Sequence, residues 1–160
     1  VARRDKLDAI LEILVDTDSE EQTIIFRRTQ EDVEWLERAL RRKGLAVSAI
    51  HGGLRQGERN AVMQAFRSGD AKLLVSTSLT SRGIDVPTVA NVVNYDIPEQ
   101  VEEYVHRIGR TARMGRPGTA VMFVSEWDIE FFEAIRGHVG AENLEELSLS
   151  IYGGLRSNGS

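Results

Sequence analysis

Hydrophobic residues follow two spacings along this chain, one typical of helices and one typical of buried strands. Leu7, Ile10, Leu11 and Leu14 fall at i, i+3, i+4 and i+7, which predicts an amphipathic helix over residues 5–15. The same reasoning predicts helices near residues 30–43, 58–67, 99–108 and 127–137. Short apolar runs predict strands at residues 23–26, 45–50, 72–75, 91–95 and 119–124. Because strands and helices alternate, we expect an α/β fold with an open parallel sheet covered by helices on both faces.

Polar and glycine residues follow four of the predicted strands. Thr29, His51, Gly52, Thr77 and Asp96 each lie just past the carboxyl end of such a strand. In open α/β sheets the carboxyl ends of the strands form the edge where ligands bind. The pattern therefore predicts a functional site at this edge.

Composition indicates one globular domain, which we place at residues 1–150, with a Gly/Ser-rich flexible tail at residues 151–160. No apolar run approaches the ~20 residues that span a bilayer, and no signal-peptide pattern is present. The chain has no cysteine and three scattered histidines, which predicts neither disulfides nor a metal site. We expect an intracellular protein of the cytoplasm or nucleus, without membrane association.

The net charge of −5 is unevenly distributed. Residues 126–150 hold seven acids and one base, which leaves a net charge of +1 over the rest of the chain. Local patches rather than the whole-chain charge attract phosphate, because salt screens exposed charges beyond about 8–10 Å. The acidic balance is therefore compatible with a nucleic-acid partner.

The most basic segment runs from Tyr104 to Arg116 and contains no carboxylate. Arg107, Arg110 and Arg113 recur every three residues, which turns their guanidinium groups toward one side of a helical turn. Arginine suits multidentate contact with phosphate, and it can act as an arginine finger on a transferring phosphoryl group. A solvated basic face is the alternative for such a charge pattern alone.

Four segments of the chain match the motifs of one enzyme family. Residues 106–113 read H-R-I-G-R-T-A-R and resemble motif VI, H-R-I-G-R-T-G-R, of the DEAD-box ATP-dependent RNA helicases, with Ala112 the one departure. Residues 24–29 resemble motif IV, and residues 51–59 resemble the element H-G-D-x-x-Q-x-x-R, with Gly53 in place of the usual Asp.

Residues 76–87 resemble motif V, and their T-S-x-x-S-R-G form is similar to the Vasa-related subgroup. The four motifs occur in the family's order, and the resemblance extends from about Lys6 to about Ile135. The chain is thus identified as resembling the C-terminal RecA-like domain of a DEAD-box RNA helicase.

This resemblance implies a set of residues at an ATP site. Arg110 and Arg113 match the arginines that reach the γ-phosphate, and His106 matches a residue that couples the motif to the other domain. Gly83 and Asp85 match residues that face the nucleotide. ATP with Mg²⁺ would then be bound mainly by an N-terminal RecA-like domain of the same protein, and none would be bound by this domain alone.

A second glycine-containing segment nearly matches a phosphate-binding P-loop. Residues 52–59 have the two glycines of G-x-x-x-x-G-K-[ST], but Glu58 and Arg59 replace the Lys and the Ser/Thr. A carboxylate at the lysine position would repel the phosphate. We therefore expect the isolated chain to be inactive as an ATPase.

The resemblance also implies an RNA-binding surface, at Thr29, Gly52, Arg59 and Thr77. Hydroxyls and backbone amides bind phosphates without reading bases, so we expect binding without base specificity. Trp35 and Trp127 lie on predicted helices, and we interpret both as packing residues.

Two arginines depart from the usual motif IV. Arg27 and Arg28 stand where apolar or small residues are more common, and they either extend the RNA surface or pair with Glu31 or Asp32.

Two other kinds of function remain open from the sequence. The domain could serve as a platform for a regulatory protein, for which the acidic residues 126–150 are a candidate surface. An unrelated cofactor-binding α/β domain would need a glycine-rich loop after the first strand, and residues 26–30 do not supply one.

Overall fold

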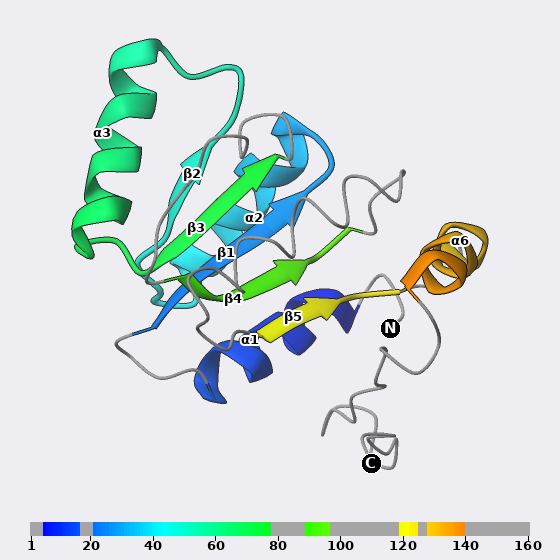
Figure 1. Cartoon of the computed structure of the whole chain (residues 1–160). Coiled ribbons are helices and arrows are strands. Elements are labelled where there is room, and N and C mark those ends of the chain that lie inside the picture. Colours follow the sequence, from blue (N-terminus) through cyan, green and yellow to red (C-terminus); the bar gives the residue numbers. More distant parts are fainter. Residues whose placement is uncertain (1–4, 17–20, 78–88, 97–118, 125–127, 140–160) are drawn as a thin grey trace.

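Five parallel strands form an open sheet, as the apolar runs predicted. The computed structural model of the chain describes residues 5–16, 21–77, 89–96, 119–124 and 128–139 (Figure 1). The strands are β1 (Gln22–Arg27), β2 (Ser48–Ile50), β3 (Leu73–Thr77), β4 (Val89–Asn94) and β5 (Thr119–Met122). Their order is β2-β3-β1-β4-β5, and every pairing is parallel. The central strand β1 therefore pairs with β3 on one side and with β4 on the other.

Helices cover both faces of this sheet. They are α1 (Lys6–Asp16), α2 (Gln30–Arg42) and α3 (Gln56–Ser68). Another described helix, α6 (Ile129–Val139), follows β5 and lies beside the sheet in Figure 1 rather than over one of its faces. In Figure 1, α3 lies on the opposite side of the sheet from α1 and α2. The α/β architecture expected from the sequence is confirmed.

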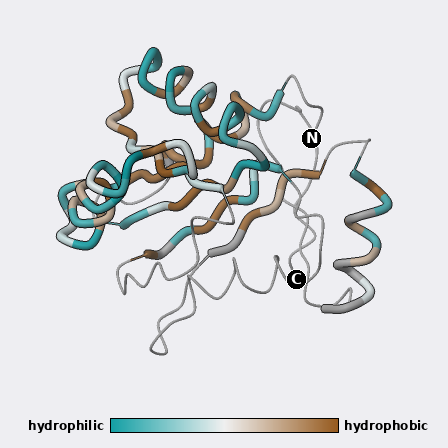
Figure 2. Tube along the Cα trace, turned by 90° about the horizontal axis from the view of Figure 1, so that it is seen from above, coloured by the Kyte–Doolittle hydropathy of each residue, from teal (hydrophilic) through white to brown (hydrophobic). Residues whose placement is uncertain are grey.

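The sheet separates two hydrophobic clusters. On one face, Ile10 of α1 and Leu36 of α2 pack against Ile25 and Val75 of the sheet. On the other face, residues of α3 pack against the alternate positions of the same strands, with Phe66 fully buried. Strands that are apolar on both sides are typical of a parallel sheet between two helical layers. Figure 2 shows this hydrophobic band along the strands between helices whose outer sides are hydrophilic.

Local signals fix the ends of α2 and α3. Thr29 caps α2, because its hydroxyl oxygen accepts a hydrogen bond from the backbone N–H of Asp32 at 3.1 Å. The chain leaves α2 through Gly44 at φ +88° and leaves α3 through Gly69 at φ +87°. Both angles lie in the left-handed region that favours glycine.

Several element boundaries differ from expectation by one to three residues, and a local contact explains two of these differences. β2 begins at Ser48 rather than at residue 45, because only its last three residues pair with β3. The preceding Val47 carbonyl accepts a hydrogen bond from the Arg41 side chain at 2.8 Å instead of joining the sheet. α3 begins two residues before the predicted start, where the Glu58 carboxylate accepts a hydrogen bond from the Arg55 N–H at 3.1 Å.

The interpretation of Trp35 as a packing residue is wrong. Trp35 is 43% exposed, and its ring lies beside the Arg27 guanidinium, 5.9 Å from the ring centroid to Cζ, rather than in the core. Trp35 and Leu36 are adjacent on α2, so their side chains leave the helix in different directions. Leu36 is the one that is buried in the core. Trp127, the predicted helix at residues 99–108 and the tail at residues 151–160 lie outside the described residues.

Candidate functional site

The carboxyl ends of β2, β3, β1 and β4 lie in that order along one edge of the sheet. Thr29 follows β1, His51 and Gly52 follow β2, Thr77 ends β3, and Asp96 follows β4. Segments far apart in the sequence are therefore neighbours at this edge. The gathering of polar residues that the sequence predicted is confirmed by the strand order.

Thr29 and Gly52 are both exposed at this edge. The Thr29 hydroxyl accepts the Asp32 N–H, and its own O–H remains a donor for a second group. A Cβ built on Gly52 would meet no atom within 4 Å, so the space beside its backbone is open. A ligand can thus approach the backbone at Gly52 closely.

Arg59 and Thr77 differ from these two residues in their burial. Arg59 lies in the first turn of α3 and is half-buried, and its Nε is buried without a hydrogen-bond partner among the described residues. Because a buried N–H without an acceptor is costly, this atom favours an acceptor from outside the described residues. Thr77 is 7% exposed at the end of β3.

The near-match to a P-loop forms a different structure. Glu58 closes the first turn of α3 through its hydrogen bond from the Arg55 N–H. Its carboxylate therefore occupies the helix N-terminus, where a phosphate would otherwise lie. The geometry of this segment does not fit a nucleotide cradle.

Five predicted site residues lie outside the described residues. They are Gly83, Asp85, His106, Arg110 and Arg113. Their predicted roles rest on sequence alone.

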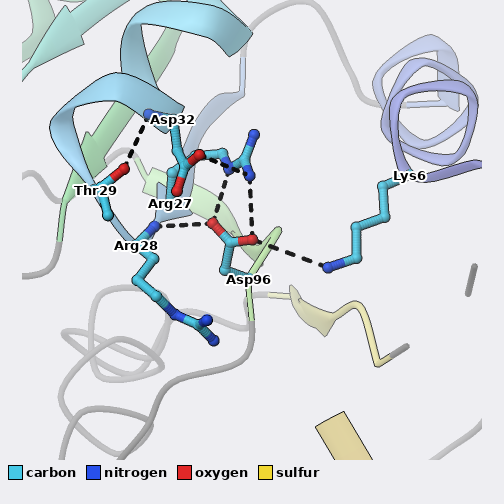
Figure 3. Close-up of polar contacts among 6 residues, drawn as sticks. All are labelled: Lys6, Arg27, Arg28, Thr29, Asp32 and Asp96. Carbon is cyan, nitrogen blue, oxygen red and sulfur yellow. Dashed lines mark hydrogen bonds and ion pairs between the residues drawn. The ribbon is translucent and has the colours of Figure 1, made fainter. Parts of the chain in front are cut away.

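Asp96 is the centre of a charged cluster at the same edge (Figure 3). Its carboxylate accepts hydrogen bonds from Arg27 Nε at 2.8 Å, from Arg27 Nη2 at 3.2 Å and from the Arg28 backbone N–H at 2.8 Å. The Lys6 ammonium of α1 lies 3.9 Å from Asp96 Oδ1. Two parallel N–H donors from one guanidinium make the Arg27 contact bidentate, the stronger kind of arginine–carboxylate pair.

The Arg27 guanidinium also lies against an aromatic ring. Its Cζ is 4.3 Å from the centroid of the Tyr95 ring, a cation–π distance. Burial raises the pKa of Tyr95 to about 12, although the charge of Arg27 opposes this rise. The Tyr95 hydroxyl therefore stays protonated at neutral pH.

The surroundings of Asp96 keep it ionised. Burial by itself would raise the pKa of Asp96, but the hydrogen bonds and charge of Arg27, the Arg28 N–H and the charge of Lys6 lower the pKa below its usual 3.8. This carboxylate is thus ionised at neutral pH and ties the end of β4 to the end of β1.

These contacts resolve the question left open for Arg27. Its Nη2 lies 3.6 Å from Asp32 Oδ1, so pairing with Asp32 is confirmed, but the closer partner is Asp96. No sequence pattern indicated that partner, because 69 positions separate the two residues. The Arg28 side chain is exposed and points away from Asp96 in Figure 3.

A second polar network at this edge was missed by sequence reasoning. Glu34 Oε1 lies 3.4 Å from His51 Nε2 and accepts a hydrogen bond from Gln30 Nε2 at 3.2 Å. His51 Nδ1 accepts a hydrogen bond from the Gly53 N–H at 3.1 Å. The network joins the first turns of α2 to the turn after β2. The i, i+4 spacing of Gln30 and Glu34 was the available signal.

The part of the chain that the structure describes contains neither a metal-binding cluster nor a membrane-spanning helix. Within this part, no group of three or more His, Asp or Glu side chains is placed to hold a metal ion. In the same part of the chain, no helix is long and apolar enough to cross a membrane.

Comparison with known proteins extends this picture. The family described as the helicase conserved C-terminal domain matches residues 5–115. A curated relative, the ATP-dependent RNA helicase FAL1 of Kluyveromyces lactis, is 39% identical over 92% of this chain. The chain spans 43% of that relative's length.

Solved structures share the fold. Dbp5 of S. cerevisiae bound to RNA and ADP BeF3 superposes with a TM-score of 0.80 at 37% identity, over 87% of this chain and 37% of that one. The DEAD-box protein SrmB of E. coli, bound to the regulator of ribonuclease activity A, gives a TM-score of 0.76 at 35% identity. That match covers 84% of this chain and 79% of the SrmB chain in that structure. The RecA-like fold expected from the motifs is confirmed.

The Asp96 cluster generates a prediction about stability. Asp96→Asn removes the charge that pairs with the half-buried Arg27, so we expect the free energy of unfolding at pH 7 to fall by about 2–3 kcal/mol. Folding lowers the pKa of Asp96 below 3.8. The contribution of this carboxylate to the free energy of unfolding is therefore fully present above pH 3.8, and it is lost as the pH falls through the lower pKa of the folded state. Urea unfolding of both proteins at pH 7 and at pH 3 measures this difference.

Asp70→Asn, which neutralises an exposed carboxylate, is the control and should change stability by less than about 0.5 kcal/mol. A gap between wild type and Asp96→Asn that stays constant from pH 7 to pH 3 would contradict the assigned charge pairing.

Proposed function

The chain belongs to the helicase conserved C-terminal domain family, in the branch of the DEAD-box RNA helicases, and from this membership we propose that it is one half of an ATP-dependent RNA helicase. In this proposal its strand edge binds the RNA backbone, and its motif VI arginines complete an ATP site on an N-terminal RecA-like domain. The proposal is supported above all by the position of three predicted RNA contacts, Thr29, Gly52 and Thr77, at adjacent carboxyl ends of parallel strands.

The RNA contacts that we propose are Thr29, Gly52, Arg59 and Thr77. The donor O–H of Thr29, the open space beside Gly52 and the buried Nε of Arg59 all suit a phosphate oxygen. None of these groups is an aromatic platform for stacking bases, which supports binding without base specificity. Dbp5, to which this chain is similar, has been solved with RNA.

At the ATP site we propose roles for five residues outside the described part of the chain. Arg110 and Arg113 would place positive charge beside the γ-phosphate, with His106 coupling the two domains and Gly83 and Asp85 facing the nucleotide. ATP with Mg²⁺ would be held mainly by the other domain. The Glu58 geometry supports this division, because it leaves no phosphate cradle at residues 52–59.

Coupling between nucleotide binding and RNA binding would then follow from the two-domain arrangement. If the RNA surface of this domain is completed by the other domain only in the ATP-bound state, nucleotide binding shifts the population toward a conformation that grips RNA. A duplex that does not fit this conformation would be strained and opened locally.

Two further proposals concern a regulatory partner and the location of the protein in the cell. A regulatory protein could dock on this domain, as SrmB binds the regulator of ribonuclease activity A, and the acidic residues 126–150 are a candidate surface. We propose an intracellular location, in the cytoplasm or nucleus. The Vasa-related subgroup suggested by motif V gains no support from the relatives, and we do not extend the proposal to it.

The isolated chain should have no ATPase activity, because residues 52–59 cannot cradle a phosphate. The measurement is phosphate release by the purified 160 residues with and without RNA. RNA-stimulated turnover that co-purifies with the chain through two chromatographic steps would overturn the division of labour between the domains.

RNA binding by this chain alone should be weak and sensitive to salt. On single strands, the logarithm of affinity falls with the logarithm of salt with a slope of about −0.7 for each phosphate neutralised. Titration of oligouridylate and oligoadenylate over a range of salt concentrations tests this, and both should bind alike. Nanomolar affinity for one base composition at physiological salt would contradict contacts to the backbone alone.

Arg113→Ala in the full-length protein should lower kcat by about 10³-fold or more, the effect of losing an arginine finger. The melting temperature of this domain should hardly change, since exposed substitutions usually shift stability by about 0.5 kcal/mol or less. The measurement is RNA-stimulated turnover beside thermal unfolding. Normal turnover by an equally stable variant would end the catalytic role of Arg113.

A further inference from the structure

Glu34 connects two segments that the proposed RNA surface uses. Thr29 immediately precedes α2, and Gly52 lies in the turn after β2. Between these two segments, Glu34 Oε1 accepts from Gln30 Nε2 at 3.2 Å and lies 3.4 Å from His51 Nε2. One carboxylate oxygen therefore contacts both a neighbour of Thr29 and a neighbour of Gly52.

The His51 ring passes this contact to the turn. Its Nδ1 accepts the Gly53 N–H at 3.1 Å, so the proton of the neutral ring is on Nε2, where it faces Glu34. His51 is only 5% exposed, and without Glu34 its Nε2–H would lose this acceptor. Glu34 thereby fixes the ring that in turn fixes the backbone on either side of Gly52.

Gln30 closes the network from the other side. A Cβ built on Gly53 would lie 2.5 Å from Gln30 Nε2 and 2.7 Å from Gln30 Cδ, so the carboxamide packs directly across the Gly53 backbone. The absence of a side chain at Gly53 allows this approach. The turn is thus held to α2 by packing as well as by the contact between His51 and Glu34.

We propose that Glu34 is a positioning residue for RNA binding: through Gln30 and His51 it sets the spacing between Thr29 and Gly52. This inference rests on the RNA surface proposed above. Glu34 itself need not touch RNA, since a carboxylate would repel the phosphate backbone.

Loss of the Glu34 charge and loss of its positioning role should change RNA affinity in opposite directions, so the proposal can be tested. Removing a carboxylate near a phosphate-binding surface should tighten RNA binding slightly if only charge matters. If Glu34 positions the turn, Glu34→Ala should weaken binding of a fluorescein-labelled ten-nucleotide oligouridylate by about 3- to 10-fold, the effect of one or two lost hydrogen bonds. Glu34→Gln carries the same charge change but keeps the accepting oxygen, so it should retain wild-type affinity within about twofold.

Glu37→Ala is the matched control. It removes a carboxylate one turn further along α2, where Glu37 pairs with Arg41 at 3.3 Å rather than with the turn after β2. Its affinity for the oligouridylate should equal that of wild type or be slightly higher. Weakening of Glu37→Ala equal to that of Glu34→Ala would overturn the proposal.

Amide hydrogen exchange without RNA tests the positioning directly. Exchange at Gly53, compared with that at Val75 in the core strand β3, should accelerate in Glu34→Ala and stay unchanged in Glu34→Gln and Glu37→Ala. The comparison with Val75 separates release of the turn from global unfolding. Unchanged relative exchange in Glu34→Ala would overturn the proposal whatever the RNA result.

Arg59→Ala distinguishes failure of this inference from failure of the proposed function. If Arg59→Ala weakens oligouridylate binding while Glu34→Ala does not, the surface binds RNA and only the positioning role is wrong. If neither variant weakens binding although Gly53 exchange accelerates, the assigned RNA surface is wrong, and the role of Glu34 in RNA binding is wrong with it.

Discussion

The parallel pairing of β1 with both β3 and β4 determines where the polar segments of this structure lie. Because all the strands run in one direction, every carboxyl end lies at the same edge, and the residues that follow them become neighbours. The order β2-β3-β1-β4-β5 places the ends of β2, β3, β1 and β4 side by side. A functional surface can therefore be assembled from short polar segments without any one loop carrying the whole site.

Two networks make this edge rigid, and each joins a different pair of segments. Arg27 and Asp96 tie β1 to β4 through a bidentate pair, and the hydrogen bonds and charge of Arg27 help to lower the pKa of Asp96 despite its burial. Glu34 ties α2 to the turn after β2 through Gln30 and His51. Thr29 lies between the two networks in sequence and caps α2. Rigid support of this kind lets small hydroxyls and backbone groups serve as ligands, because they cannot adjust their own positions as long side chains do.

The fold was predictable because burial on both sides of the strands leaves a strong periodic signal. The same periodicity did not predict the exposure of Trp35. It indicates which side of a helix faces the core, but it does not indicate how much of a large ring at the edge of that side is exposed. Contacts such as Arg27 with Asp96 were not predictable, because two charged residues far apart in sequence show no pattern until the strand order is known. The position of Thr29 at the sheet edge was predictable from the end of one strand and the start of one helix, which are local signals.

We propose that this domain binds the RNA backbone at the carboxyl edge of its sheet. A chemical-shift map of the ¹⁵N-labelled chain during titration with a ten-nucleotide oligouridylate tests this proposal. The largest shifts should fall at Thr29, Gly52, Arg59 and Thr77, with little change at Gln22 and Lys72, which lie at or near the amino ends of β1 and β3. Shifts concentrated at the amino-terminal edge of the sheet, with none at those four residues, would contradict it.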